Sequence, residues 1–239
     1  MTGQLTDMGA AAQIFWPLWE RLLDKWPEIV TATWETLQMV LLSTVFSLAS
    51  GFLLAILMIV TNPLMSLRPC RPVYQVVDFV VNLLRSFPIF LVILQQIEGN
   101  VIYPKVVGTS IGSAAAIVPL TVAAAPFVAR LIEGCFLEVD KGVIEAARSF
   151  GASNGQIIFR VLLPEALPSI VLNVAVIAIT LLGYSAMAGT VGGGGLGDLA
   201  VKYGYNRFQV DIMVYSVVIL CILVLVIQGL CNLLYKLLR

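Results

Sequence analysis

The sequence contains no histidine, and only 12% of its 239 residues are charged. The absence of histidine removes the commonest proton shuttle and metal ligand. The four cysteines form no C-x-x-C pair, and Cys221 and Cys231 lie in one apolar run, so neither a disulfide framework nor a zinc site is expected. Phosphate-loop, serine hydrolase and metalloprotease motifs are also absent. We therefore expect a chain with no catalytic site, no bound metal and no other cofactor of its own.

Hydrophobic residues make up 59% of the chain. A soluble domain rarely has this composition, whereas a polytopic helical membrane protein does. The formal net charge is zero, so no nucleic-acid partner is expected. The composition therefore predicts an all-α protein whose surroundings are the lipid bilayer.

Long uncharged runs indicate where the chain crosses the membrane. A bilayer core of about 30 Å is crossed by about 20 helical residues. Five runs fit this length, although the second contains Asp78 and Arg85. They are Met39–Val60, Val73–Ile97, Val106–Ala129, Ala166–Met187 and Ile212–Tyr235. Five spans place the two termini on opposite sides of the membrane.

Residues 1–35 precede the membrane domain of residues 36–235 and contain no predicted span. No basic segment followed by an apolar core is present, so this is not a cleaved signal peptide. The run Ile14–Val30 holds three tryptophans among charges, and tryptophan prefers the membrane interface. We expect an extracytoplasmic helix lying flat on the membrane, ended or kinked at Pro27. A soluble tail without membrane contact is the alternative.

A polar island, residues 145–164 with the sequence EAARSFGASNGQIIFRVLLP, interrupts the hydrophobic sequence. In so hydrophobic a chain, this island must lie in water and face a partner that membrane helices cannot reach. Val143–Phe150 has helical spacing of its apolar residues, and Gly151 stands where a glycine would cap the helix. Ala146 and Ala147 are small enough for another protein to approach closely. The alternative is a solvated loop helix without a partner.

The distribution of basic residues favours a cytoplasmic island. That orientation puts eight basic residues inside and five outside, with the N-terminus outside and the C-terminus in the cytoplasm. The inner set is Arg68, Arg71, Arg130, Lys141, Arg148, Arg160, Lys236 and Arg239, and the outer set is Arg21, Lys25, Lys105, Lys202 and Arg207.

Arg85 has two interpretations. Charges at membrane depth usually face a bundle interior or a cavity, so Arg85 could line a translocation path. Alternatively, the second helix starts near Leu84 and both Arg85 and Asp78 lie at the cytoplasmic surface.

The run Gly189–Leu199, GTVGGGGLGDL, is rich in glycine. It lacks the Lys-Ser/Thr ending of a phosphate loop, so nucleotide binding is not expected. We expect its glycines to let the backbone fold tightly over the mouth of a pore. The gate residues would be Gly192, Gly193, Gly194, Gly195 and Gly197.

The residues just before the glycine-rich run mix small and polar side chains, which suits close helix packing around a path. Tyr184, Ser185 and Met187 are the candidate path residues. Ordinary small-residue packing without substrate contact is the alternative.

The spacing within the polar island resembles the EAA loop of permease subunits of bacterial ABC importers. The matching residues are Glu145, Ala146, Ala147, Arg148, Gly151, Leu163 and Pro164. The one departure is Val161, where that family usually has isoleucine. The resemblance implies the type I ABC importer permease fold, with a cytoplasmic loop, residues 131–165, whose short coupling helix docks on an ATPase subunit.

Longer stretches resemble the permeases of bacterial methionine importers. These are Gly108–Glu133, Val161–Val171 and Gly183–Gly197, within a resemblance that spans Trp34–Tyr235. The resemblance implies a homodimer in the bacterial plasma (inner) membrane. Two ATPase subunits would bind ATP and Mg and hydrolyse the ATP, and an extracytoplasmic substrate-binding lipoprotein would deliver L-methionine, with D-methionine as a second candidate substrate. Another amino acid, a betaine-like osmolyte, or a non-transporting membrane anchor or scaffold are the alternatives.

Overall fold

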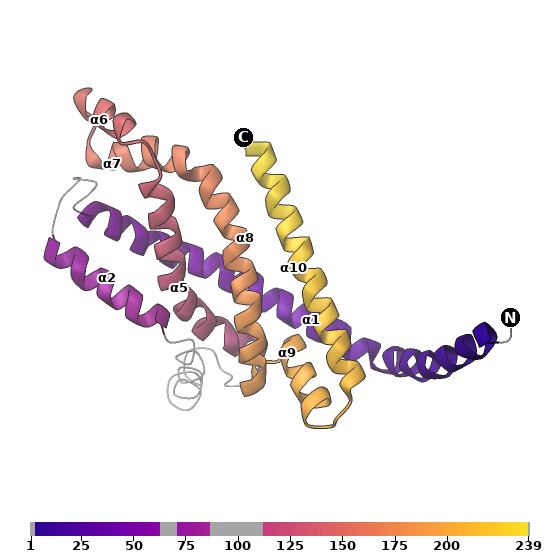
Figure 1. Cartoon of the computed structure of the whole chain (residues 1–239). Coiled ribbons are helices and arrows are strands. Elements are labelled where there is room, and N and C mark those ends of the chain that lie inside the picture. The colour runs from indigo at the N-terminus through magenta and orange to yellow at the C-terminus, as the bar shows by residue number, and fades with distance from the viewer. Residues whose placement is uncertain (1–2, 63–70, 87–111, 239) are drawn as a thin grey trace.

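The computed structural model describes residues 3–62, 71–86 and 112–238, and every regular element in these ranges is a helix (Figure 1). The α-helices are α1 (Gly3–Thr61), α2 (Arg71–Ser86), α5 (Ser113–Leu137), α6 (Lys141–Ser149), α7 (Asn154–Ile157), α8 (Leu163–Ala188), α9 (Gly195–Leu199) and α10 (Val210–Leu238). Three π-helical segments join them, namely η1 (Ile158–Leu162), η2 (Gly189–Gly193) and η3 (Ala200–Tyr205). The predicted all-α class is confirmed.

Four helical segments in the described ranges are long and apolar enough to cross a membrane. They are Leu23–Thr61, Ser113–Leu137, Asn154–Ala188 and Val210–Leu237, and they contain most or all of four of the five predicted spans. The predicted second span falls on α2, which starts at Arg71, and its remainder lies outside the described residues. A start of this helix near Leu84 is therefore wrong, while the position of Asp78 and Arg85 relative to the membrane and the count of five spans stay predictions.

α1 is one continuous helix that passes through Pro27, so the predicted end of a separate interfacial helix there is wrong. An interior proline costs a helix about 3 kcal/mol. Beyond Pro27, Ile29 and Ala32 are buried against Leu196 and Tyr203, and this packing holds the helix together. The segment Leu23–Thr61 has 39 residues and is about 58 Å long, nearly twice the bilayer core. Figure 1 shows α1 crossing the other long helices obliquely, as its length requires.

α5 is longer than predicted at its carboxyl end. The predicted span ends at Ala129, before the charge of Arg130, but the helix continues to Leu137. Arg130 does not break the helix because it forms an ion pair with Glu133, three residues later and on the same face. Ile132 and Phe136 are buried in the main core on the same stretch. Residues 131–137 therefore belong to this helix and not to the predicted loop of residues 131–165.

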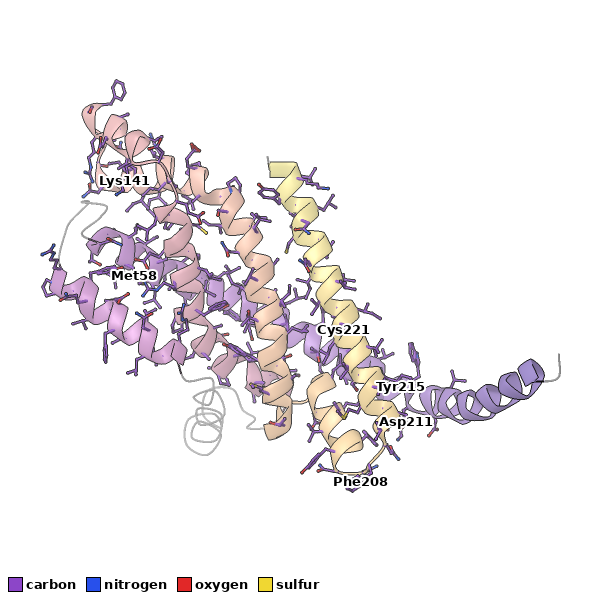
Figure 2. The ribbon with its side chains drawn as sticks, in the orientation of Figure 1. Met58, Lys141, Phe208, Asp211, Tyr215 and Cys221 are labelled. Atoms are coloured by element: carbon purple, nitrogen blue, oxygen red, sulfur yellow. The ribbon has the colours of Figure 1, made fainter. Side chains whose placement is uncertain are left out.

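The main apolar core lies between α1, α5 and α8, and the elements of the polar island cover one end of it. Gly51 of α1 lets α1 approach α5, since a Cβ there would lie 2.6 Å from Cγ1 of Val128. α10 packs beside α8 and turns apolar side chains such as Val218 and Leu225 outward. Figure 2 shows Lys141, at the start of α6, and Phe208, just before α10, at opposite extremities of the molecule.

Candidate functional site

The polar island folds into the short helix α6, which has a defined cap at its start. The Asp140 carboxylate accepts a hydrogen bond of 2.8 Å from the backbone N–H of Gly142. Aspartate is among the preferred residues for this position because it satisfies an otherwise unpaired helix N–H. The helix accordingly starts at Lys141, two residues before the predicted start at Val143.

A glycine cap ends α6, as predicted. Gly151 has a φ of 79°, the left-handed region that glycine adopts without strain. Its N–H donates to the carbonyl of Arg148 over 2.8 Å, and the N–H of Ala152 donates to the carbonyl of Ala147 over 3.1 Å. These two bonds form the Schellman motif. The end of the helix is therefore fixed by backbone geometry that depends on Gly151.

The helical spacing of the apolar residues in Val143–Phe150 predicts one apolar face, but the structure distributes these residues over two faces of α6 with different neighbours. Ile144 is buried and Ala147 is partly buried, and both pack against the chain's own core. Val143, Ala146 and Phe150 point outward, and 91% of the Phe150 side chain is exposed. Ala146 can therefore meet a partner, whereas Ala147 holds α6 on its own protein.

The outward face continues onto η1. Phe159 is 56% exposed, and Arg160 beside it is exposed as well. Large exposed apolar side chains that gather on one surface indicate a site of protein association. We call Val143, Ala146, Phe150 and Phe159 the docking surface. The other motif residues frame it, with Glu145 and Pro164 exposed and Arg148 and Leu163 partly buried.

The connection between α6 and α8 is compact. Ser153 and Gln156 form a reciprocal capping box at the start of α7, in which each side chain bonds the other residue's backbone N–H. Ile157, Ile158 and Leu162 are buried in the same core as Ile144. α6, α7 and η1 are therefore held on the end of the helical core as one unit.

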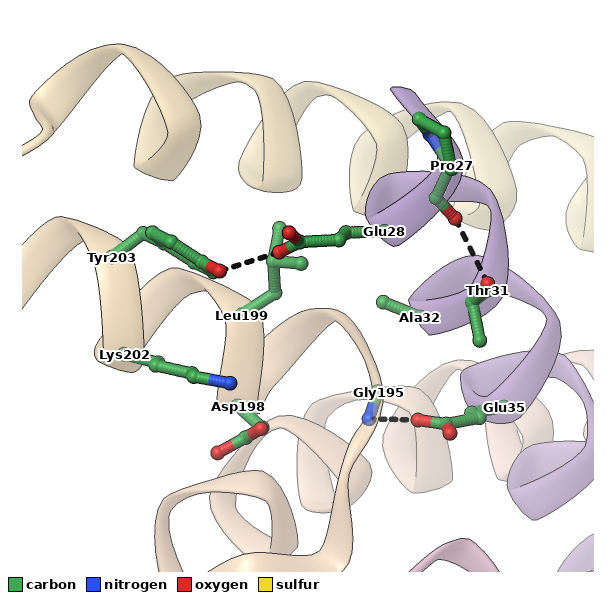
Figure 3. A pocket seen from close by; sticks show the side chains of 10 residues that line it. All are labelled: Pro27, Glu28, Thr31, Ala32, Glu35, Gly195, Asp198, Leu199, Lys202 and Tyr203. Atoms are coloured by element: carbon green, nitrogen blue, oxygen red, sulfur yellow. Dashed lines mark hydrogen bonds between the residues drawn. The ribbon is translucent and has the colours of Figure 1, made fainter. Parts of the chain in front are cut away.

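At the opposite end, the glycine-rich run is helical and not a loop. η2 and α9 occupy most of it, and α9 docks on α1. The backbone N–H of Gly195 donates to Glu35 Oε2 over 2.9 Å (Figure 3). The backbone N–H of Leu196 donates to Thr36 Oγ1 over 2.9 Å. No local pattern could identify these partners, because Glu35 and Thr36 lie 160 residues earlier.

The glycines of this run permit backbone contacts that a side chain would prevent. A Cβ on Gly197 would lie 2.5 Å from Cα of Ala186, and one on Gly189 would lie 2.4 Å from the backbone nitrogen of Asp198. Gly194 and Gly195 have positive φ values and face Glu35 and Thr36 just as closely. The tight folding expected here is present, while a gating role stays a prediction.

A cleft of about 400 Å³ lies between α1 and the α9–η3 segment (Figure 3). On one side of it, the Tyr203 hydroxyl donates to Glu28 Oε2 over 2.5 Å, and Lys25 pairs with Glu28 Oε1 over 2.8 Å. The cations of Lys25 and Arg207 lie 5.0 and 4.8 Å from the Tyr203 ring centroid. These contacts fasten the first part of α1 to η3.

The structure separates the predicted path residues. Tyr184 is partly buried against the core, and Ser185 is buried with its hydroxyl donating to the carbonyl of Leu182 over 2.8 Å. Met187 is 49% exposed on the outer face of α8. A path along this face would therefore meet Met187 and not Ser185. Arg85 is exposed in the last turn of α2.

Val176 and Gly183 share the outer face of α8 with Met187 at helical spacing, with Thr180 partly exposed between them. Nothing lies within 4 Å of a Cβ built on Gly183. A face with a glycine and a threonine in the middle of an apolar helix is typical of close approach by another element.

A buried polar network at the junction of α1, α2 and α5 was not predicted. Arg130 donates to Asp78 and, over 3.1 Å, to Asn82 Oδ1 on α2. It also donates to Glu133 Oε2 over 2.7 Å. Each charge could be seen in the sequence, but Asp78 and Arg130 lie 52 residues apart. The Arg130–Glu133 spacing was the one local sign that α5 continues past Arg130.

Glu133 connects this network to two further segments. Its Oε1 accepts hydrogen bonds from Asn62 Nδ2 over 3.3 Å and from the Tyr74 hydroxyl over 3.1 Å. Its side chain is 1% exposed. A carboxylate this deeply buried needs such partners, because an unpaired buried charge is costly.

Known proteins with similar sequences share this architecture. The family described as "Binding-protein-dependent transport system inner membrane component" matches residues 49–239. The chain is 49% identical over 201 residues to the probable D-methionine transport system permease protein MetI of Vibrio cholerae, which covers 84% of this chain and 88% of that protein. It is 44% identical over 163 residues to the methionine import system permease protein MetP of Bacillus subtilis, covering 68% and 72% of the two chains.

A solved structure of the MetNI methionine ABC transporter in inward-facing conformations matches with a TM-score of 0.84. The match has 41% sequence identity and covers 90% of this chain and 98% of that one. The likeness extends to the long apolar helices, and the chain has the type I importer permease fold. With a family match over most of its length, the chain belongs to the binding-protein-dependent transport system inner membrane component family of multi-pass membrane proteins.

Proposed function

We propose that this chain is the permease subunit of an ATP-driven methionine importer. The relatives with the highest identities cited above are named for methionine or D-methionine transport, and the matched solved structure is a methionine ABC transporter. The observation that carries the mechanism is the docking surface, where a phenylalanine of 91% exposure stands on a capped helix at one end of the helical core. A membrane anchor would have no need to present such a surface.

The docking surface fits an ATPase subunit as its partner. Phe150 and Phe159 supply exposed apolar anchors, and the small Ala146, exposed on the same helix as Phe150, lets the partner's backbone approach. ATP and Mg would bind to that partner, since the chain carries no phosphate-binding loop. Closure of two ATPases around ATP would displace α6 in each permease of a homodimer, and a substrate-binding lipoprotein would deliver methionine on the opposite side.

The path proposed here runs between the two permeases along the outer face of α8, past Val176, Thr180, Gly183 and Met187. The small residues leave room, and Met187 offers a thioether that can contact the methionine side chain. ATP-driven displacement of α6 would switch this path between inward and outward access. Such coupling is a shift between two arrangements of one bundle, biased by ligands at separate sites.

The predicted orientation gives a direct labelling test. Ser153 follows α6, and Asp198 lies on α9 at the other end of the molecule. In a cysteine-free variant, cysteines at Ser153 and Asp198 are expected to react with an impermeant thiol reagent from opposite sides, with Asp198 outside. Labelling of both positions from the same side would contradict the orientation.

Arg85 is exposed, so a role in the path can be tested without disturbing the core. If Arg85 lines the path, Arg85→Leu will reduce methionine import about tenfold, the effect of losing about 1.4 kcal/mol of interaction. The amount of ATPase that copurifies with the variant will be unchanged. Import at the wild-type rate would place Arg85 outside the path.

The function itself is tested by reconstitution. Permease, its ATPase and its binding lipoprotein in liposomes should accumulate L-methionine only when ATP is supplied to the ATPase side. D-methionine, other amino acids and glycine betaine are offered in parallel. Uptake of one of these compounds in place of methionine would identify that compound as the substrate. Absence of any uptake would favour the alternative that the chain is a non-transporting scaffold.

A further inference from the structure

The partly buried network of Arg130 and Glu133 joins α5 to α2 and to the end of α1. Asn62 follows α1, Tyr74 and Asp78 belong to α2, and Arg130 and Glu133 belong to α5. Every contact in this set crosses between segments, except the Arg130–Glu133 pair within α5. One guanidinium therefore bridges two carboxylates from different helices, and one of those carboxylates also binds the end of α1.

The burial of Glu133 makes this junction resist separation. Breaking a buried ion pair by removing one partner leaves an uncompensated charge, which costs far more than the pair contributes. Sliding α2 away from α5 would leave the Arg130–Glu133 pair within α5 intact, but the buried Glu133 would lose the Tyr74 hydroxyl, and the partly exposed pair of Arg130 with Asp78 would separate. These contacts therefore favour one relative position of α2 and α5.

An apolar layer next to the network joins the same helices. Met58 of α1, Val81 of α2 and Ala129 of α5 are buried together. Tyr74 contributes to both layers, since its ring packs on this cluster while its hydroxyl donates to Glu133. The polar and apolar contacts thus favour the same arrangement of α1, α2 and α5.

α5 is also attached directly to α6. The helix ends at Leu137, and Asp140 already caps α6. Phe136 and Val139 lie in the same buried cluster as Ile144 of α6. A displacement of the docking surface would therefore be transmitted directly to the end of α5, close to Glu133.

We propose that Arg130 and Glu133 are positioning residues that make α1, α2 and α5 follow α6 as one rigid body when the importer changes access. This inference rests on the proposed function, in which the ATPase displaces α6. The network then couples a displacement of α6, a helix of nine residues, to a movement of α1, α2 and α5. Its loss would leave ATP hydrolysis intact but disconnected from transport.

The test compares methionine transported per ATP hydrolysed in liposomes holding the complete complex. Arg130→Lys keeps the charge but loses the planar fork that serves two carboxylates at once. We expect transport per ATP to fall about fivefold or more, the lower end of typical coupling between sites. Tyr74→Phe removes one hydroxyl and should lower the ratio about threefold, as the loss of one hydrogen bond allows.

Thr121→Val is the matched control. Thr121 also lies on α5, but its hydroxyl donates within the helix to the carbonyl of Ile117 over 2.7 Å. Its transport per ATP should equal that of the unmodified complex. If Arg130→Lys or Tyr74→Phe merely lowers the yield of assembled complex while transport per ATP stays at the wild-type value, the network is structural only and the inference is wrong.

A second measurement follows the movement itself. Spin labels at Val76 on α2 and Ser149 on α6, both exposed, report the distance between these helices. We expect the same distance with and without ATP in the unmodified complex, and a broadened or shifted distance in Arg130→Lys. A distance that changes with ATP in the unmodified complex would contradict the inference that α2 and α6 move as one rigid body. Failure of the unmodified complex to import methionine would overturn the proposed function, and this inference with it.

Discussion

Replacing Gly151 with valine is expected to reduce methionine import about tenfold or more. Gly151 has a φ of 79°, and a residue with a Cβ pays about 1–2 kcal/mol in that region, more when it is β-branched. The penalty falls on a helix of nine residues, which is marginal in water without its packing. Loss of about 1.4 kcal/mol is a tenfold change in the population of the docked helix. Import into liposomes and copurification of the ATPase both measure it.

Two variants separate the backbone effect from a general effect of mutation. Gly151→Asn should retain most of the import, because asparagine tolerates the left-handed region better than other side chains. Gly155→Val places the same side chain four residues later, where φ is not positive and nothing lies within 4 Å of the new Cβ. Equal import by Gly151→Val and Gly155→Val would show that the cap does not matter for coupling.

Ala146→Trp probes the outward face of α6 independently. Ala147 is not suitable for this test, because it packs on the chain's own core and a tryptophan there would disturb the permease itself. Ala146 is exposed, and bulk there would obstruct a partner alone. Ala146→Trp should abolish retention of the ATPase while the thermal midpoint of the purified permease is unchanged. Retention of the ATPase at the wild-type level would show that the ATPase binds at a different surface.

Local patterns were enough to predict much of the fold. Four apolar runs, the glycine cap at Gly151 and the end of α8 near Met187 depend on residues close together in the sequence. The continuation of α1 through Pro27 does not, because it depends on packing against Leu196 and Tyr203, far along the chain. The continuation of α5 through Arg130 has one local sign, Glu133 three residues later, whereas the second partner, Asp78 of α2, could not be read from a local pattern. Tertiary packing and ion pairs override the local signals of proline and charge.

The same distinction explains the candidate site. The order Glu-Ala-Ala followed by a capping glycine identified the docking helix, yet a helical spacing alone could not say which face turns inward. Ile144 and Ala147 pack on the core because Phe136 and Ile157 lie beneath them, from elements on either side of α6. Likewise, the exposure of Met187 and the burial of Ser185 follow from where α1 and α5 cover α8.

Gly197→Ala is expected to destabilise the chain strongly by adding one methyl group at the other end of the molecule. The new Cβ would lie 2.5 Å from both Cα and the carbonyl oxygen of Ala186, and backbone atoms in a helix cannot move aside. Overpacking of this kind costs about 1–3 kcal/mol, so a chain of this size should lose about 3–10 °C in its thermal midpoint. α9 would separate from α8 and also strain its bonds to Glu35 and Thr36.

Gly183→Ala, on the neighbouring helix α8, is expected to raise the thermal midpoint instead of lowering it. Gly183 lies within α8 with no atom near a built Cβ, so alanine there should stabilise the helix by about 0.5–1 kcal/mol and raise the midpoint. The two variants add the same methyl group to a glycine packed against backbone atoms and to one with no atom within 4 Å of its built Cβ. Thermal unfolding of the purified permease, followed by helical circular dichroism, measures both. A midpoint for Gly197→Ala equal to that of the unmodified chain would mean that α8 and α9 do not approach each other backbone to backbone. The glycine-rich run would then be free to move as a loop, and a gate at this end would need no rigid docking on α1.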